Sequence, residues 1–259
     1  MHPRTTLLAL ALACAPSFAL AQDAADTPPD GWTGTGELGF ALSRGNARSE
    51  SLNARLAFGR EDAQWKHDWY LAALRAKGEV SADFDGDGVA EERYELNANR
   101  YELGASSGYK FDARNYIIGS GRYENDDFSP YEYQATLAVS YGRTLIDSER
   151  TRLSTEIGPG LRRARSVETG ATESGAIVRG KLDFAHQLTG NTQLVNTLLI
   201  ESGSDNTFAQ NDLGIVVAMN EAFSLKAGLQ ARHNTEVDNA PGVKKTDTLT
   251  TINLVYNFR

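Results

Sequence analysis

The segment Asp83-Phe84-Asp85-Gly86-Asp87-Gly88 places three aspartates at the spacing of metal ligands. An EF-hand calcium loop has oxygen ligands at positions 1, 3 and 5, glycine at position 6 and a bidentate glutamate at position 12. Position 12 here is Tyr94, and the flanking segments alternate like strands instead of forming helices. Two alternatives follow: an acidic loop tip in water, or a Ca²⁺ or Mg²⁺ ion held by Asp83, Asp85 and Asp87 against lipid phosphates.

Histidine is the next residue type that could do chemistry. Barrel enzymes that cut lipids combine serine, histidine and an Asn, Asp or Glu at the lipid-facing rim. After the first 21 residues the chain has His67, His186 and His233, and the first two fall on the face expected to point outward. Spacing along the chain does not reveal which serine would lie within hydrogen-bond reach of them, so interfacial histidine is the simpler interpretation and no catalytic residue is predicted.

A third motif, Gly34-Thr35-Gly36-Glu37-Leu38-Gly39, formally matches the dinucleotide-binding pattern G-x-G-x-x-G. That pattern binds a pyrophosphate only where a helix begins directly after a strand, and no helix is predicted here. The glycines are better explained as points where a strand can curve. No nucleotide cofactor is expected.

The last segment of the chain has the pattern that positions most other charged residues. From Thr248 to Arg259, apolar and aromatic side chains alternate with polar ones, which predicts a strand with one apolar face. The pattern recurs in about twelve segments from Trp32 onward, without a sustained helical period. In an outer-membrane barrel such a face meets lipid, and aromatic residues form a girdle at its borders. The residues expected in this girdle are Trp32, Trp65, Trp69, Tyr131 and Tyr141.

Charged residues of both signs lie on the opposite face of the same segments. A dry core could not hold so many charges without a large cost in hydration free energy. A water-filled lumen could hold them, paired with one another. The residues expected to point into the lumen are Glu37, Arg55, Lys66, Asp68, Arg152, Glu156, Arg162, Arg179, Lys181, Asp183, Glu201, Asp212, Lys226 and Arg232.

The connections between these segments fall into two alternating classes, one short and one longer and more polar. This arrangement is typical of an outer-membrane barrel with short periplasmic turns and longer outer loops. Two segments depart from the simple pattern. Gly158-Pro159-Gly160 lies inside a predicted strand, where we expect a bulge or kink. Near Arg100 the apolar parity shifts, which predicts either a bulge or a strand that projects beyond the bilayer.

The ends and the composition of the chain set further limits. Residues 1–21 have the short apolar run and small-residue cleavage site of a secretory signal peptide, and they contain Cys14, the single cysteine. We expect a flexible leader over 22–31 and the barrel domain over 32–259. The formal net charge is −8, and the chain has no basic stripe of the kind that binds nucleic acid.

The segments WTGTGELGFALSRGNARSESLNARLAF, YENDDFSPYEYQATLAVSYGRTLIDSERTRLSTEIGPGLRR and LVYNFR resemble the salt-induced outer-membrane protein family. This is a domain family of unknown function in Gram-negative bacteria, and the similarity covers about Trp32 to Arg259. The resemblance implies an outer-membrane location and a link to salt or osmotic conditions. It brings no catalytic residues.

The sequence therefore predicts an all-β protein: a single antiparallel transmembrane barrel of about twelve strands, exported to the outer membrane. The leading functional hypothesis is a role in envelope structure or in adaptation to salt or osmotic conditions. The alternatives are a narrow pore for small solutes or ions, and a lipid-modifying enzyme. The expected partners are outer-membrane lipids, lipopolysaccharide and the barrel-assembly machinery, and the expected state is a monomer that binds no nucleic acid.

Overall fold

The computed structural model describes residues 31–43, 49–83, 85, 89–236 and 245–258. The expected signal peptide and nearly all of the expected leader lie outside these residues. No helix in the described ranges is long and apolar enough to cross a membrane.

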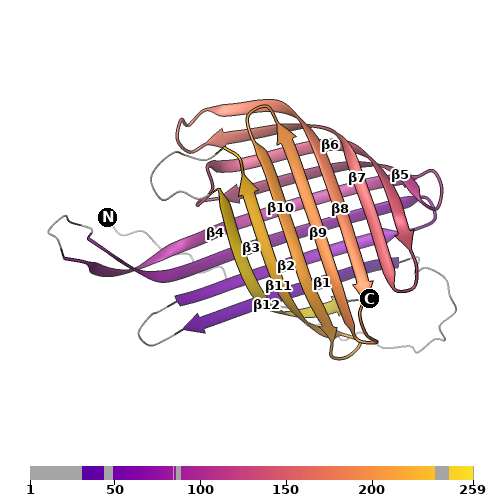
Figure 1. The fold of residues 1–259 in the computed structure, drawn as a ribbon, viewed down its shortest axis with the longest axis horizontal. Coiled ribbons are helices and arrows are strands. Elements are labelled where there is room, and N and C mark those ends of the chain that lie inside the picture. The colour runs from indigo at the N-terminus through magenta and orange to yellow at the C-terminus, as the bar shows by residue number, and fades with distance from the viewer. Residues whose placement is uncertain (1–30, 44–48, 84, 86–88, 237–244, 259) are drawn as a thin grey trace.

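Twelve antiparallel strands of the described chain close into one barrel, in which β1 pairs with β12 (Figure 1). Each strand also pairs with the next one along the chain, so the sheet has no open side. The all-β, twelve-stranded barrel predicted from the alternation is confirmed. The strands are β1 (Gly31–Ser43), β2 (Ser49–Glu61), β3 (Trp65–Ala82), β4 (Glu91–Lys110), β5 (Asn115–Asp126), β6 (Tyr131–Asp147), β7 (Thr151–Ser166), β8 (Thr172–Gln187), β9 (Thr192–Gly203), β10 (Thr207–Ala218), β11 (Phe223–Asn234) and β12 (Thr246–Phe258).

The barrel is apolar outside and polar inside. Leu137 on β6 and Leu161 on β7 are register partners, and they are 69% and 65% exposed. Thr136 and Arg162, their neighbours in the sequence, are also partners, and both are buried. One step along a strand thus moves from the apolar outer face to the polar interior, because successive side chains point to opposite faces.

The two ends of the barrel differ in their connections. The turn end carries residues 62–64, 111–114, 148–150, 188–191 and 219–222. The loop end carries residues 44–48, 83–90, 127–130, 167–171, 204–206 and 235–245. The two longest connections, 83–90 and 235–245, are at the loop end, whereas 127–130 and 204–206 are as short as the turns opposite.

The hairpin of β3 and β4 is longer than its neighbours and contains a bulge. Ala76 pairs with Ala98 but Lys77 pairs with Leu96, so Asn97 is an extra residue in β4. This bulge explains the change of apolar parity in that stretch of the sequence. Since β5 pairs only with the second half of β4, the tip of the hairpin extends beyond the barrel wall (Figure 1). The bulge that the sequence predicted therefore occurs, whereas a projection beyond the bilayer stays a prediction.

Pro159 lies within β7, and the expected bulge is absent there. Its partner on β8 is Val178, and the register of β7 shifts against neither neighbour at this point. A Cβ atom on Gly158 would lie 2.0 Å from the carbonyl oxygen of Val139 on β6. The flanking glycines therefore let two strands approach closely around a residue without a backbone N–H, so the ladder needs no extra residue.

Tyr131, at the start of β6, lies inside the barrel, and its expected place in the outer girdle is wrong. The register of β6 against β7 shifts between Tyr131 and Tyr133, which makes Glu132 an extra residue and changes the parity. Tyr131 is buried, and the guanidinium carbon of Arg162 lies 5.1 Å from the centre of its ring.

Candidate functional site

Three charged side chains of β5 point into the lumen near the loop end. Arg122, Glu124 and Asp126 are two residues apart, so their side chains follow one another along the inner face. Tyr123, between the first two, is on the outer face and stacks on Tyr133 at 6.1 Å. The alternation of β5 thus aims a line of charges at the opposite wall.

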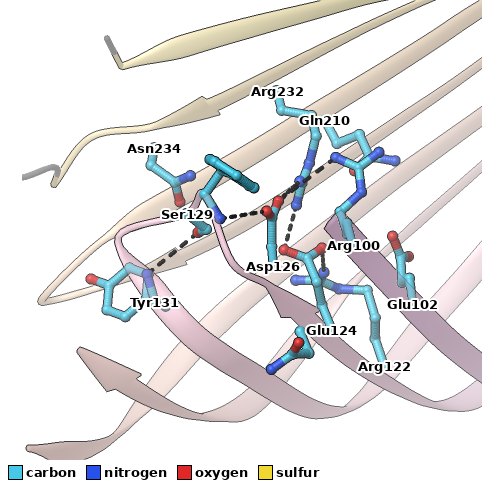
Figure 2. A network of polar contacts seen from close by, with 12 residues as sticks. Arg100, Glu102, Arg122, Glu124, Asp126, Ser129, Tyr131, Gln210, Arg232 and Asn234 are labelled. Atoms are coloured by element: carbon cyan, nitrogen blue, oxygen red, sulfur yellow. Dashed lines mark hydrogen bonds and ion pairs between the residues drawn. The ribbon is translucent and has the colours of Figure 1, made fainter. Parts of the chain in front are cut away.

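These charges join others from β4, β9 and β11 in a network that we call the crossbar, and Figure 2 shows its members from β4, β5 and β11. Its members are Arg100, Arg122, Glu124, Asp126, Glu201 and Arg232. Arg122 Nη1 and Nη2 lie 2.9 and 2.6 Å from carboxylate oxygens of Glu124 and Glu201. Arg232 Nη2 and Nη1 lie 2.5 and 2.9 Å from oxygens of Glu124 and Asp126. Each arginine is therefore shared between two carboxylates.

The crossbar spans the lumen because its members come from strands that are not neighbours. Arg100 on β4 donates from Nη2 to the side-chain oxygen of Gln230 on β11, at 2.6 Å. Thr136 on β6 donates to Glu201 on β9, at 2.9 Å. The Arg122, Glu124, Glu201 and Arg232 side chains are all 8% exposed or less. These four side chains are thus shielded from water.

Phe208 on β10 lies between the two central arginines. Its ring centre is 4.6 Å from the guanidinium carbon of Arg122 and 5.1 Å from that of Arg232. The side chain is fully buried. An aromatic face attracts a cation. The ring of Phe208 therefore stabilises both guanidinium groups, in addition to their ion pairs with carboxylates.

On the turn-end side of the crossbar the lumen holds a cavity of about 540 Å³, which we call the chamber. Its lining runs from Thr33 and Gly59, near the turn end, to Arg122 in the crossbar. A second cavity of about 230 Å³ lies beside it, and Arg55, Glu102 and Asp212 line both. The lumen is therefore a polar space that the crossbar limits on one side.

Several predicted lumen charges meet as ion pairs in or near the chamber. Glu156 pairs with Arg179 at 3.0 Å and also accepts a hydrogen bond from the hydroxyl of Tyr116, at 3.3 Å. Lys181 pairs with Asp183 at 2.6 Å. In a low-dielectric wall such pairs offset much of the cost of burying each charge.

The remaining predicted charges are also on the inner side. Lys226 pairs with Glu37 at 2.9 Å. Arg152 lies near the turn end, 3.4 Å from Asp147, and this pair is exposed. The structure places the other predicted lumen residues in the crossbar, beside Tyr131 or in the chamber wall: Arg55, Lys66, Asp68, Arg162, Glu201, Asp212 and Arg232.

Sequence reasoning missed five residues of this site: Arg100, Glu102, Arg122, Glu124 and Asp126. In β5 the inner face begins with Tyr116 and Ile118, which are apolar and buried, so the face did not look like a lumen face. In β4 the bulge hid the parity. Counting alternate residues from Tyr116 to Asp126 would have found the three charges of β5.

Beyond the crossbar, the loop end opens into a third cavity, of about 900 Å³, which we call the vestibule. Lys245 is the one lysine or arginine among its described lining residues. Its carboxylates are Asp127, Glu168, Glu173, Asp205, Glu236 and Asp247. The loop-end mouth of the lumen is therefore strongly acidic, which raises the local concentration of cations.

Comparison with known protein families identifies the group to which this barrel belongs. The family described as "Protein of unknown function, DUF481" matches residues 36–258, which is most of the barrel. The chain belongs to the DUF481 family. The match confirms the domain family of unknown function named from the sequence, whereas the link to salt stays a prediction.

One uncharacterised protein and two solved structures are similar to this DUF481 barrel. The uncharacterized protein YdiY of Escherichia coli K12 is 25% identical over 223 residues, covering 85% of this chain and 81% of YdiY. Among solved structures, the translocator domain of the autotransporter NalP from Neisseria meningitidis is 12% identical, covers 90% of each chain and has a TM-score of 0.47. The NanC porin is 9% identical, covers 88% of this chain and 98% of its own, and has a TM-score of 0.46.

The three histidines of the DUF481 barrel contact threonine or aromatic residues. His67 stacks between Trp65 and Trp69 on the outer face, with ring centres 5.7 and 5.6 Å away. The ring nitrogen Nδ1 of His186 and that of His233 lie 2.8 and 2.9 Å from threonine hydroxyls. These contacts suit structural histidines at the rim of a barrel.

The acidic motif of the β3–β4 connection lies at the tip of the projecting hairpin. Asp83 and Asp85 are exposed there, while Asp87 and Phe84 are outside the described residues. The part of the chain that is described holds no group of three residues able to ligate a metal. The Ca²⁺ or Mg²⁺ site stays a prediction.

Proposed function

We propose that this protein is an outer-membrane barrel that provides a narrow path for small hydrophilic solutes and is closed by the crossbar on its outer side. In that position it would contact outer-membrane lipids and lipopolysaccharide. It would be inserted by the barrel-assembly machinery and act as a monomer. The turn end would face the periplasm and the acidic vestibule the exterior.

The outer surface supports the membrane location. Large apolar side chains of all twelve strands are exposed on it, which water would disfavour and lipid would not. Aromatic residues gather near the turn end, where Trp32 stacks on Trp69 at 5.4 Å and Trp65 meets Tyr109 at 5.3 Å. Aromatic rings at this height are typical of the border between lipid and water.

The observation that carries the transport role is the chamber. A barrel that served only as a scaffold could fill its interior with side chains, as eight-stranded barrels do. Here a polar cavity of about 540 Å³ leads up to Arg122 of the crossbar. The lumen thus has room for solute on one side and a removable closure on the other.

Conductance in planar lipid bilayers tests this function. The double variant Arg122→Gln/Glu201→Gln removes the pair that spans from β5 to β9 without leaving either charge alone. We expect small, rare current steps for the unaltered protein and larger, frequent steps for the variant. The matched control is Arg165→Gln/Glu132→Gln, which removes an exposed pair at 3.1 Å outside the lumen and should change nothing. A variant that folds, migrates with heat-modifiable mobility and stays silent would refute the path.

A second candidate is a role in the envelope under salt or osmotic stress, which the closed crossbar favours. A barrel that passes no solute must act through its surfaces, such as the projecting hairpin of β3 and β4 (Figure 1). Cells lacking the protein should then lose growth or envelope integrity at high salt. The crossbar double variant should restore both as well as the unaltered protein. Rescue only by conducting forms would favour transport.

A further inference from the structure

The chamber contains two cations that have no carboxylate partner. Within the described residues, neither Arg55 nor Lys66 has a carboxylate oxygen within the 4.0 Å that defines an ion pair. The guanidinium carbon of Arg55 lies 4.2 Å from the ring centre of Tyr70. The ammonium nitrogen of Lys66 lies 5.7 Å from that of Tyr116. Both positive groups line the chamber and are partly accessible.

The same chamber contains three carboxylates that have no lysine or arginine nitrogen of the described chain within 4.0 Å. Across the described chain, Asp68 makes no ion pair or hydrogen bond, and it is exposed to the lumen. Glu102 accepts a hydrogen bond from the neutral hydroxyl of Tyr70. Asp212 accepts hydrogen bonds from two glutamine side chains, at 2.8 and 2.6 Å. The wall therefore offers unpaired charges of both signs to whatever enters.

Opposite charges are spaced along one part of this wall. Lys66 and Asp68 are two residues apart on β3, about 7 Å along the strand. Asp68 pairs in register with Gly59, and Arg55 is four residues further along β2, about 13 Å away. A solute lying along the wall thus meets a cation, an anion and a second cation in turn.

We propose that the chamber binds a small zwitterion, a solute that carries one carboxylate and one ammonium group. The inference names the solute class for the path proposed above, and it rests on that function. A simple anion would pair with Arg55 but would be repelled by Asp68 and Glu102. A simple cation would be attracted by these two carboxylates but repelled by Arg55. A zwitterion pairs with both signs at once, so the repulsive groups supply the selectivity. The chamber lies within the usual range for ligand pockets, about 300 to 1,000 Å³.

Three ligands of one chain length test the proposal: 4-aminobutanoate, butanoate and butylammonium. Each would be radiolabelled and dialysed at low salt against the protein in lipid nanodiscs. We expect saturable binding of 4-aminobutanoate with a Kd at least about tenfold below that of either other ligand, since one charge-assisted contact is worth roughly that factor. Comparable binding of butanoate or butylammonium, or no saturable binding of 4-aminobutanoate, would refute the zwitterion proposal.

Variants assign the binding to the chamber. Arg55→Gln and Asp68→Asn should each raise the Kd for 4-aminobutanoate about tenfold, because each removes one of the two charges that the zwitterion needs. Arg165→Gln, which changes the net charge as Arg55→Gln does but lies outside the lumen, should leave the Kd unchanged. Heat-modifiable migration identifies any variant that does not fold, and Lys66→Gln then replaces it. Unchanged binding in the folded chamber variants contradicts the inference.

Dialysis needs no ion flow, so this test separates the inference from the transport role. If the barrel conducts but binds all three ligands alike, the transport role is supported and the zwitterion site is refuted. If the barrel binds 4-aminobutanoate selectively but conducts in no variant, the zwitterion site is supported and the transport role is refuted.

Discussion

Arg122 and Glu201 meet across the lumen, with 2.6 Å between Nη2 and Oε2, although their strands β5 and β9 are not neighbours in the sheet. Their side chains are 6% and 1% exposed. The contact ties two walls of the barrel that the backbone ladder connects only through three other strands. We therefore expect it to contribute to the stability of the barrel.

Replacing Arg122 alone should destabilise the barrel strongly. Arg122→Gln leaves the carboxylates of Glu201 and Glu124 buried with less positive charge beside them, and breaking a buried pair in this way costs about 3–5 kcal/mol. The free energy of unfolding can be measured by urea titration of the protein in lipid vesicles, with tryptophan fluorescence as the signal. The matched control, Arg165→Gln, breaks an exposed pair and should cost about 0–1 kcal/mol. Equal costs would mean that water reaches the crossbar.

Phe208 should stabilise the crossbar through its ring and not only through its volume. Phe208→Leu keeps much of the buried apolar surface but removes the aromatic face from Arg122 and Arg232, so we expect a loss of about 1–2 kcal/mol. The same urea titration measures it. Phe40→Leu, at an outward residue that is 66% exposed, is the control and should cost less. A loss that persists when both arginines are replaced would argue against the cation–π contact.

The barrel could be predicted because its strands repeat one simple rule. Alternation places Leu137 outside and Thr136 inside whatever their distant neighbours are, so the number of strands follows from local pattern. The rule failed where an extra residue entered a strand. Glu132 and Asn97 are such residues, and they explain the misplaced Tyr131 and the hidden inner face of β4.

The crossbar could not be predicted in the same way. Alternation indicates which residues point inward, but it gives no information on which strand each one faces across the lumen. The pairing of Arg122 with Glu201 depends on barrel closure and on strand stagger, which involve every strand at once. The bulge expected at Pro159 is absent for a related reason: the space that its neighbouring glycines leave for β6 depends on two strands together.

The close approach of β6 and β7 at Gly158 should make this glycine irreplaceable. In Gly158→Ala the new Cβ would lie 2.0 Å from the Val139 oxygen, so β6 and β7 would have to separate at this point. The neighbouring proline has no backbone N–H, so it adds no hydrogen bond that would hold the strands together. We expect a loss of several kcal/mol in urea titration, or failure to fold. Gly119→Ala, also within a strand, places its Cβ where nothing lies within 4 Å, and stability should hold or rise slightly. Similar losses in both variants would contradict this explanation.

The turn between β4 and β5 should lose its order in acid. The side-chain amide of Asn115, and the backbone N–H groups of Arg114 and Asn115, donate hydrogen bonds to Asp112 and lower the pKa of its carboxyl. Since the folded pKa is lowered, the stabilisation is fully present above the ordinary aspartate pKa of about 3.9 and is lost as the pH falls through the folded value. Hydrogen-exchange protection of the Arg114 and Asn115 amides should therefore drop in strong acid. Asp112→Asn keeps an acceptor that does not titrate, so its protection should not follow pH in this window.

The apolar outer face should reject charge most strongly at mid-height if it lies in a bilayer. Leu137 is in the middle third of β6 and Leu145 is near its turn end, and both side chains are exposed. Leu137→Arg should cost about 2–4 kcal/mol in lipid vesicles, while Leu145→Arg should cost about 0–1 kcal/mol, because the guanidinium at the border can reach water. In detergent micelles, which adapt to the protein, the difference should shrink. Equal costs at the two heights in vesicles would mean that lipid does not surround this face. That result would refute the proposed membrane location.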